Sequence, residues 1–263
     1  MLVICSLLLL LLTSCENPIT GYGPQPEFLD EHKHKPMLNV FGVLRPEQEL
    51  GVPLSYVHLE AAYSVTSDYP DSFIIADAEV GLRRYSGNTV QDSLNLVYTN
   101  FDTLFSEHEY RSLDFYPQPG ETYGIVCRRD GFPVLTSQTT MPFVPIIEAG
   151  SMEIKDEELS FSIVRDPLAG LYDVFLWVDE QRFAARVLRP ETGNTGINLK
   201  FNKGNIESGT LYIYAYDMKL TEYMTSVITV KPNTYQPPVS TVENGYGCFG
   251  SLNVLEQVIE FDQ

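Results

Sequence analysis

Apolar and polar positions alternate with a period of two over most of the chain beyond residue 36, and turn residues interrupt the pattern at short intervals. Strict alternation is typical of strands that bury one face. We therefore predict strands near residues 38–45, 55–63, 77–85, 94–99, 110–115, 122–129 and 133–139. No helical pattern separates them, which favours an all-β sandwich of antiparallel strands.

A second alternating series follows "MPFVPIIEAG", which begins at Met141. Its two prolines cannot donate hydrogen bonds to a sheet, so we place a domain boundary there. The second series comprises "LSFSIVRD", "LYDVFLWVDEQRFAARVL", "INLKFNK" and "TLYIYAYD". We predict two tandem β-sandwich domains, immunoglobulin-like or transthyretin-like, at residues 37–143 and 144–263.

One stretch has helical spacing of its apolar residues. In "DMKLTEYMTSV" these are Leu220, Tyr223, Met224 and Val227. We expect this short helix to close one end of the second sandwich.

The segment "GYGCFG" matches the glycine spacing of a dinucleotide-binding loop at Gly245, Gly247 and Gly250. That loop works only between a strand and a helix, and the context here leaves no room for such a unit. We interpret the glycines as the start of a last strand.

The apolar run from Leu2 to Leu12 is too short to span a bilayer as a helix. Leu12-Thr13-Ser14-Cys15 resembles the bacterial lipobox, so residues 1–14 are predicted to be a signal peptide cleaved after Ser14. Acyl chains on Cys15 would then anchor the protein to a membrane. Met1–Ile4 lacks the positive charge usual in such signals, a departure that a start upstream of Met1 would explain.

Residues 15–36 are polar and rich in proline and glycine, which predicts a flexible tether. His32 and His34 lie in it without a nearby cysteine, and we expect no metal site there. Cys127 lies on the apolar face of its predicted strand, so we expect it in the core. Export would permit a Cys127–Cys248 disulfide, and two free thiols are the alternative.

The chain carries 35 acidic and 17 basic residues, a net charge of -18. Such a surface repels phosphate backbones, so nucleic acid is not an expected partner. No nucleophile elbow, zinc-protease motif, phosphate loop or calcium loop is present, and we expect neither a cofactor nor catalytic residues. A triad that includes His58 or His108, assembled from distant positions, stays open.

Aromatic residues gather on two of the predicted strands. Tyr212, Tyr214 and Tyr216 share one face of a strand, opposite Leu211, Ile213 and Ala215. Phe175 and Trp177 form a similar pair, and they share their face with Asp173 and Asp179, which suggests a partly wet surface. The five aromatic residues are a candidate face for sugar rings or for another protein, and packing within the molecule is the alternative.

Four segments together resemble the DUF4249 family of Bacteroidetes lipoproteins. They are "MLNVFGVLRPEQELGVPLSYVHLE", "IADAEVGLRRYSGN", "PQPGETYGIVCRRDGFPVLTSQTTMP" and "VENGYGCFGSLNV". The resemblance implies a cell-envelope lipoprotein at the outer membrane, with no established activity. It also implies an association with TonB-dependent outer-membrane receptors.

These observations lead us to expect a non-enzymatic lipoprotein, anchored through Cys15, that acts as a binding or accessory subunit of such a nutrient-uptake system. The alternative is an adhesive or structural surface protein that acts through protein contacts. An envelope hydrolase has less support. Whether the ligand is a small molecule or a glycan stays open.

Overall fold

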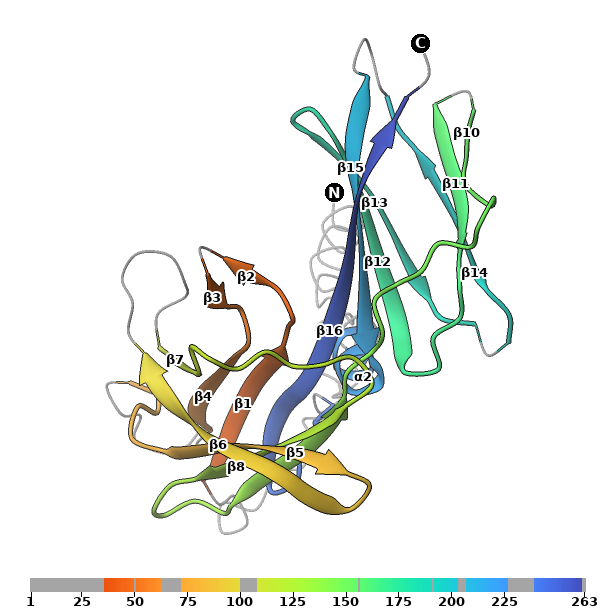
Figure 1. Ribbon diagram of the computed structural model, residues 1–263. Coiled ribbons are helices and arrows are strands. Elements are labelled where there is room, and N and C mark those ends of the chain that lie inside the picture. The colour runs from red at the N-terminus through yellow and green to blue at the C-terminus, as the bar shows by residue number, and fades with distance from the viewer. Residues whose placement is uncertain are drawn as a thin grey trace, which may run out of the picture.

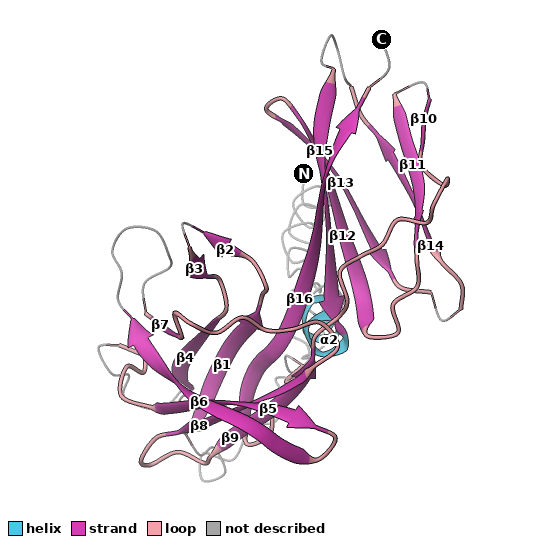
Figure 2. Cartoon of the chain, viewed as in Figure 1, coloured by secondary structure: helices cyan, strands magenta, loops and turns pink. Residues whose placement is uncertain are grey.

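The computed structural model describes residues 36–49, 51–62, 72–99, 108–155, 157–190, 192–202, 207–226 and 239–261. Strands make up most of this part of the chain, and one short helix accompanies them (Figure 2). The all-β, sandwich-like fold class is therefore confirmed. The expected signal peptide and nearly all of the expected tether, Cys15 included, lie outside the described residues.

The first series of strands matches the predicted series closely. Its members are β1 (Met37–Leu44), β2 (Gln48–Glu49), β3 (Val52–Pro53), β4 (Tyr56–Ala62), β5 (Glu79–Ser86), β6 (Thr89–Thr99), β7 (Glu109–Arg111), β8 (Thr122–Arg128) and β9 (Leu135–Thr140). The prediction for 110–115 was too long, because β7 ends at Arg111 and Leu113 is exposed. The first half of β6 was missed because its exposed residues lack the apolar alternation.

The second series continues in the same way. It comprises β10 (Glu153–Lys155), β11 (Glu158–Ile163), β12 (Ala169–Val178), β13 (Gln181–Leu188), β14 (Thr195–Lys200), β15 (Ser208–Asp217), α2 (Met218–Ser226) and β16 (Gly245–Glu260). We call β1–β9 the N-terminal unit and β10–β15 the C-terminal unit.

Within the described residues, eleven strands form one continuous sheet in the order β13-β12-β15-β16-β1-β4-β7-β6-β5-β8-β9. Strand β16 joins its two parts: residues 245–251 pair in parallel with β1, and residues 252–260 pair antiparallel with β15. Figure 1 shows β16 running from one unit into the other. The expected division at residues 143 and 144 stays a prediction, and the structure adds that β16 is shared, with Phe249 in the core of the N-terminal unit.

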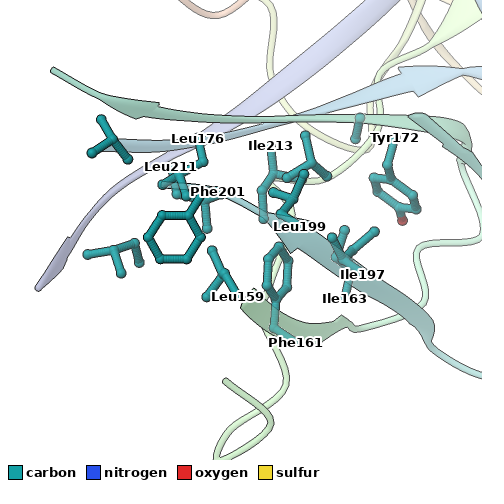
Figure 3. Packing of buried hydrophobic residues seen from close by; sticks show 14 of the residues in the cluster. Leu159, Phe161, Ile163, Tyr172, Leu176, Ile197, Leu199, Phe201, Leu211 and Ile213 are labelled. Carbon is teal, nitrogen blue, oxygen red and sulfur yellow. The ribbon is translucent and has the colours of Figure 1, made fainter. Parts of the chain in front are cut away.

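The C-terminal unit is a sandwich of two sheets. Strands β10, β11 and β14 face β13, β12, β15 and the second half of β16. Leu159 and Leu199 of the smaller sheet pack in one cluster with Leu176, Leu211 and Ile213 of the larger one (Figure 3). In β15, burial follows the alternation seen in the sequence, with Leu211 and Ile213 buried on the face opposite the tyrosines.

In the N-terminal unit the sheet bends over itself, so that β5, β6 and β8 lie across β1, β4 and β16 (Figure 1). Strand β9 lies next to the segment that leads into β16. There the Ser137 hydroxyl donates a hydrogen bond to the Thr241 carbonyl at 3.0 Å. Cys127 is fully buried in this core, as predicted, and Cys248 is buried elsewhere. Both thiols are free, which settles the alternative left open by the sequence.

The helix α2 begins where β15 ends. The Asp217 carboxylate accepts a hydrogen bond from the backbone N–H of Leu220 at 2.7 Å and so caps the first turn. Leu220 packs against Val43, Cys248 and Leu252. The helix packs against the start of β12, where its Thr221 side chain lies beside Gly170, and against residues of β1 and β16. It therefore lies where the two units meet, and the expectation that it closes an end of the second sandwich left out its contacts with β1. Val227 lies outside the described residues.

The segment "GYGCFG" forms the start of β16, as interpreted from the sequence. Gly247 has a φ of +97°, and an ideal Cβ there would lie 1.9 Å from the Val40 carbonyl oxygen. Only glycine fits such a close approach of two backbones. No helix in the described part of the chain is long and apolar enough to cross a membrane.

Candidate ligand-binding site

The outer face of β15 carries the three tyrosines singled out from the sequence. Leu211, Ile213 and Ala215 are fully buried on the inner face, so the phenol side chains point the other way. Strand β12 pairs with β15 so that Phe175 lies opposite Tyr212. The alternation therefore assigned both faces of β15 correctly.

All five aromatic candidates line one pocket of about 620 Å³. We call it the aromatic groove. Its lining residues are Arg45, Phe175, Trp177, Arg182, Thr210, Tyr212, Tyr214, Tyr216 and Leu252. They come from both units, because Arg45 follows β1 and Leu252 lies on the shared strand β16.

The aromatic rings support one another in fixed orientations. The Tyr212 and Tyr214 rings are nearly parallel, with centroids 6.4 Å apart and an interplanar angle of 17°. The Phe175 ring meets Tyr214 edge-on, with centroids 5.9 Å apart. Offset and edge-on contacts of this kind stabilise aromatic clusters, so the ring faces are preorganised before any ligand arrives.

A guanidinium covers one end of the groove. Arg182 lies over the Phe175 ring at 5.2 Å from its centroid and over the Trp177 ring at 5.9 Å. Trp177 and Arg182 are cross-strand partners on β12 and β13, and 41% of Trp177 is exposed. The arrangement is a cation–π contact that leaves an indole accessible to ligand.

The tyrosine hydroxyls of the groove are held in their neutral, donating form. Tyr212 Oη donates a hydrogen bond to Glu256 Oε1 at 3.2 Å, and partial burial together with this carboxylate raises the pKa of Tyr212. Burial, followed by the charge of Glu47, raises the pKa of Tyr214. Burial, followed by the nearby Asp173 carboxylate, raises the pKa of Tyr216. All three phenols therefore stay protonated at neutral pH.

Ion pairs flank the groove on two sides. Arg186 donates to both Asp173 carboxylate oxygens at 2.6 Å, which compensates the burial of that carboxylate. Arg45 binds Glu47 through two hydrogen bonds of 2.8 and 2.7 Å. The sequence predicts a partly wet face at Asp173, and this is wrong, because Asp173 is buried and paired with Arg186. The exposed edge of the groove is at Trp177.

Four lining residues were not predicted from the sequence: Arg45, Arg182, Thr210 and Leu252. Arg182 could have been found, because a two-residue turn in "WVDEQR" places it opposite Trp177 in a hairpin. Leu252 reaches the groove through the pairing of β16 with β15, where it lies opposite Tyr216. Arg45 reaches it through the pairing of β1 with β16. No local pattern marks either pairing.

The two histidines considered for hydrolysis lie apart from the groove, on β4 and beside β7. His58 contacts Glu60 Oε1 through Nε2 at 3.2 Å and the His108 carbonyl through Nδ1 at 3.0 Å. His108 Nδ1 contacts the Tyr98 hydroxyl at 2.5 Å. The Glu60 carboxylate and the Tyr98 phenol thus contact different imidazoles, and this arrangement gives the hydrolase alternative no support.

A second pocket, of about 780 Å³, lies between β9 and the start of α2. Asp217 borders it, and burial raises the pKa of this carboxyl to about 7. Asp217 accepts hydrogen bonds from the Leu220 backbone N–H and from the Thr139 hydroxyl. These bonds give it a structural role as the cap of α2. In the part of the chain that the structure describes, no three His, Cys, Asp or Glu side chains cluster as metal ligands, and His32 and His34 lie outside it.

No family model matches the chain, and no curated protein shows a significant sequence match. The class of protein is therefore assigned from the structure alone. The chain is an all-β protein with an aromatic groove on the outer face of its long sheet.

Proposed function

We propose that this chain is a cell-envelope lipoprotein that binds its ligand in the aromatic groove. One observation carries the proposal: five aromatic side chains chosen from sequence alternation alone line the same pocket. Both units contribute to that pocket, since Arg45 and Leu252 lie beside residues of β12, β13 and β15. Concave sites that combine aromatic faces with a few polar groups are typical ligand sites.

The location in the envelope rests on the sequence. The lipobox-like Leu12–Cys15 segment supports acylation at Cys15, and the proline-rich residues 15–36 would serve as a stem. The resemblance to DUF4249 lipoproteins supports the outer membrane and a TonB-dependent receptor as the partner. On this proposal the protein is a non-enzymatic accessory subunit that presents its ligand to the receptor.

A second candidate function is adhesion through protein contacts. Exposed Trp177 and Arg182 favour it, because tryptophan and arginine are enriched where protein interfaces gain most of their binding energy. Both functions would use the same groove, and they differ in the occupant.

Recovery of the full chain from native membranes tests the proposal. We compare the wild type with the double variant Tyr212→Ser/Tyr214→Ser and with Tyr116→Ser, an exposed tyrosine outside the groove. The wild type and Tyr116→Ser should co-purify with a receptor or a bound ligand, and the double variant should not. Circular dichroism checks that the double variant is folded, as expected from its intact inner face.

Recovery of the wild type alone, with neither ligand nor partner, would contradict the accessory role. Recovery of a partner protein without a small ligand, lost in the double variant, would favour adhesion.

A further inference from the structure

The groove contains a guanidinium without a counter-charge. Within the described residues, Arg182 has neither an ion pair nor a hydrogen bond, and its side chain is exposed. The neighbouring arginines differ, since Arg186 pairs with Asp173 and Arg45 pairs with Glu47. In a chain of net charge -18, an exposed and unpaired guanidinium beside aromatic rings is suited to an anionic group.

Glu256, which contacts the lining residue Tyr212, does not neutralise this guanidinium. Glu256 lies on β16 and accepts the hydrogen bond of Tyr212, whereas Arg182 lies on β13. Strands β12 and β15 lie between them. At about 4.8 Å per strand, the two side chains start about 14 Å apart. An anion on Arg182 would thus avoid most of the repulsion from Glu256.

The remaining lining fits a ring that carries hydroxyl groups. Tyr212, Tyr214 and Phe175 line the groove with aromatic rings, against which the C–H groups of a sugar ring can pack. The Thr210 hydroxyl and the protonated phenols can donate to and accept from sugar hydroxyls.

From this juxtaposition we propose that the aromatic groove binds an acidic saccharide. The sugar ring stacks beside Phe175 and Tyr212, and its carboxylate accepts hydrogen bonds from the Arg182 guanidinium. A guanidinium can donate two parallel hydrogen bonds to one carboxylate, which fixes the orientation of the ring as well as its charge. This inference rests on the proposed function and names the ligand class of the same groove.

Two other ligand classes fit less well. A peptide added as an extra strand needs a free strand edge, and the edge at this end of the sheet is the outer side of β13. A strand added there would lie beyond Arg182 and away from the rings, because β12 and β15 beneath the groove are both paired on two sides. An acyl chain would cover Arg182 without offering it an acceptor, which costs free energy. An acidic saccharide satisfies the guanidinium and the ring faces together.

The single tryptophan of the chain makes the groove directly observable. Because Trp177 is that residue and lines the groove, its fluorescence should change when a ligand binds. We titrate the purified full chain in detergent with trigalacturonic acid and with its methyl ester, by fluorescence and by calorimetry. The acid should bind saturably and the ester about tenfold more weakly, as expected for the loss of a hydrogen-bonded charge.

Variants test whether Arg182 causes the preference for the acid over its methyl ester. Arg182→Gln should abolish the difference between acid and ester, whereas Tyr212→Ser should weaken both. Arg129→Gln is the matched control, because Arg129 also lies over an aromatic ring, Phe132 at 5.4 Å, but sits in the N-terminal unit. It should leave both affinities unchanged.

Equal binding of acid and ester, or a preference that survives in Arg182→Gln, would overturn the acidic class and leave groove binding intact. Absence of saccharide binding, with partner recovery still dependent on Tyr212 and Tyr214, would overturn the saccharide and leave the proposed function. Tighter, Arg182-dependent binding of a hexaglutamate peptide would also overturn it. If the wild type bound no saccharide and also recovered no partner or ligand from membranes, the proposed function itself would be contradicted.

Discussion

The Thr139 hydroxyl on β9 donates a hydrogen bond to the carboxylate of Asp217, the residue that ends β15 and caps α2. Thr139 also contacts the Ser251 hydroxyl of β16 at 3.0 Å. One buried carboxyl therefore connects the edge of the N-terminal unit, the helix and the shared strand. Its ionisation should affect how firmly these three elements hold together.

Asp217 should make stability depend on pH between about 4 and 7. Burial raises the pKa of the folded carboxyl to about 7 from 3.8. Between these values the unfolded chain is ionised while the folded chain keeps its proton, so stability falls as pH rises. The loss is complete above about pH 7, on the order of 4 kcal/mol.

The variant Asp217→Asn isolates this effect, because asparagine also caps helices and does not titrate. We measure the free energy of unfolding of both proteins in urea. The variant's value minus the wild-type value should increase from pH 4 to pH 7 and stay constant above pH 7. Asp114→Asn, at an exposed carboxylate, controls for the loss of one negative charge. Parallel curves over the whole range would mean that Asp217 keeps an ordinary pKa.

Gly247→Ala should break the pairing of β1 with β16. The added Cβ would overlap the Val40 carbonyl, and the positive φ would be strained as well. We expect a loss of about 3 kcal/mol or more in urea unfolding. Gly193→Ala is the matched control, because Gly193 has a φ of +80° but nothing within 4 Å of its Cβ position. Similar losses in both variants would show that φ, and not the backbone approach, matters.

Both described thiols should resist modification in the folded protein. Burial raises the pKa of Cys127 to about 12 and that of Cys248 to about 12. Because the thiolate is the reactive form, a disulfide reagent at pH 8 should label neither residue until denaturant is added. Rapid labelling without denaturant, located by peptide mapping, would contradict their burial.

Cys15→Ser should release the protein from membranes. Without the acyl chains, no predicted segment of the mature chain holds it to a bilayer, so the variant should move from the envelope fraction to the soluble fraction. Cys5→Ser, within the predicted signal peptide, should fractionate as the wild type does. If Cys15→Ser stayed with envelopes to the same extent, another anchor would have to exist.

Local alternation was sufficient to predict most strands and the two faces of β15. Leu211 and Tyr212 were assigned to opposite faces because neighbouring side chains of a strand always point apart. The same rule placed Cys127 in the core. It failed at β7, where only three residues pair and the following Leu113 is exposed.

What alternation could not provide is the neighbour of each strand. Residues of β1 and β16 meet across about 200 positions of sequence, and neither segment carries a mark of the other. Arg45 reaches the groove by that pairing alone. The binding surface was therefore predicted as a row of tyrosines, and its charged boundary emerged only from the tertiary structure.

The shared strand β16 also imposes an order on folding. Neither unit can finish its sheet before residues 245–260 are available, since β1 waits for the first half and β15 for the second. A growing polypeptide therefore leaves both sheets incomplete until residues 245–260 have been synthesised. Late closure of both cores by one segment would suit the export that we propose, because a chain that crosses a narrow translocation channel must do so before it folds.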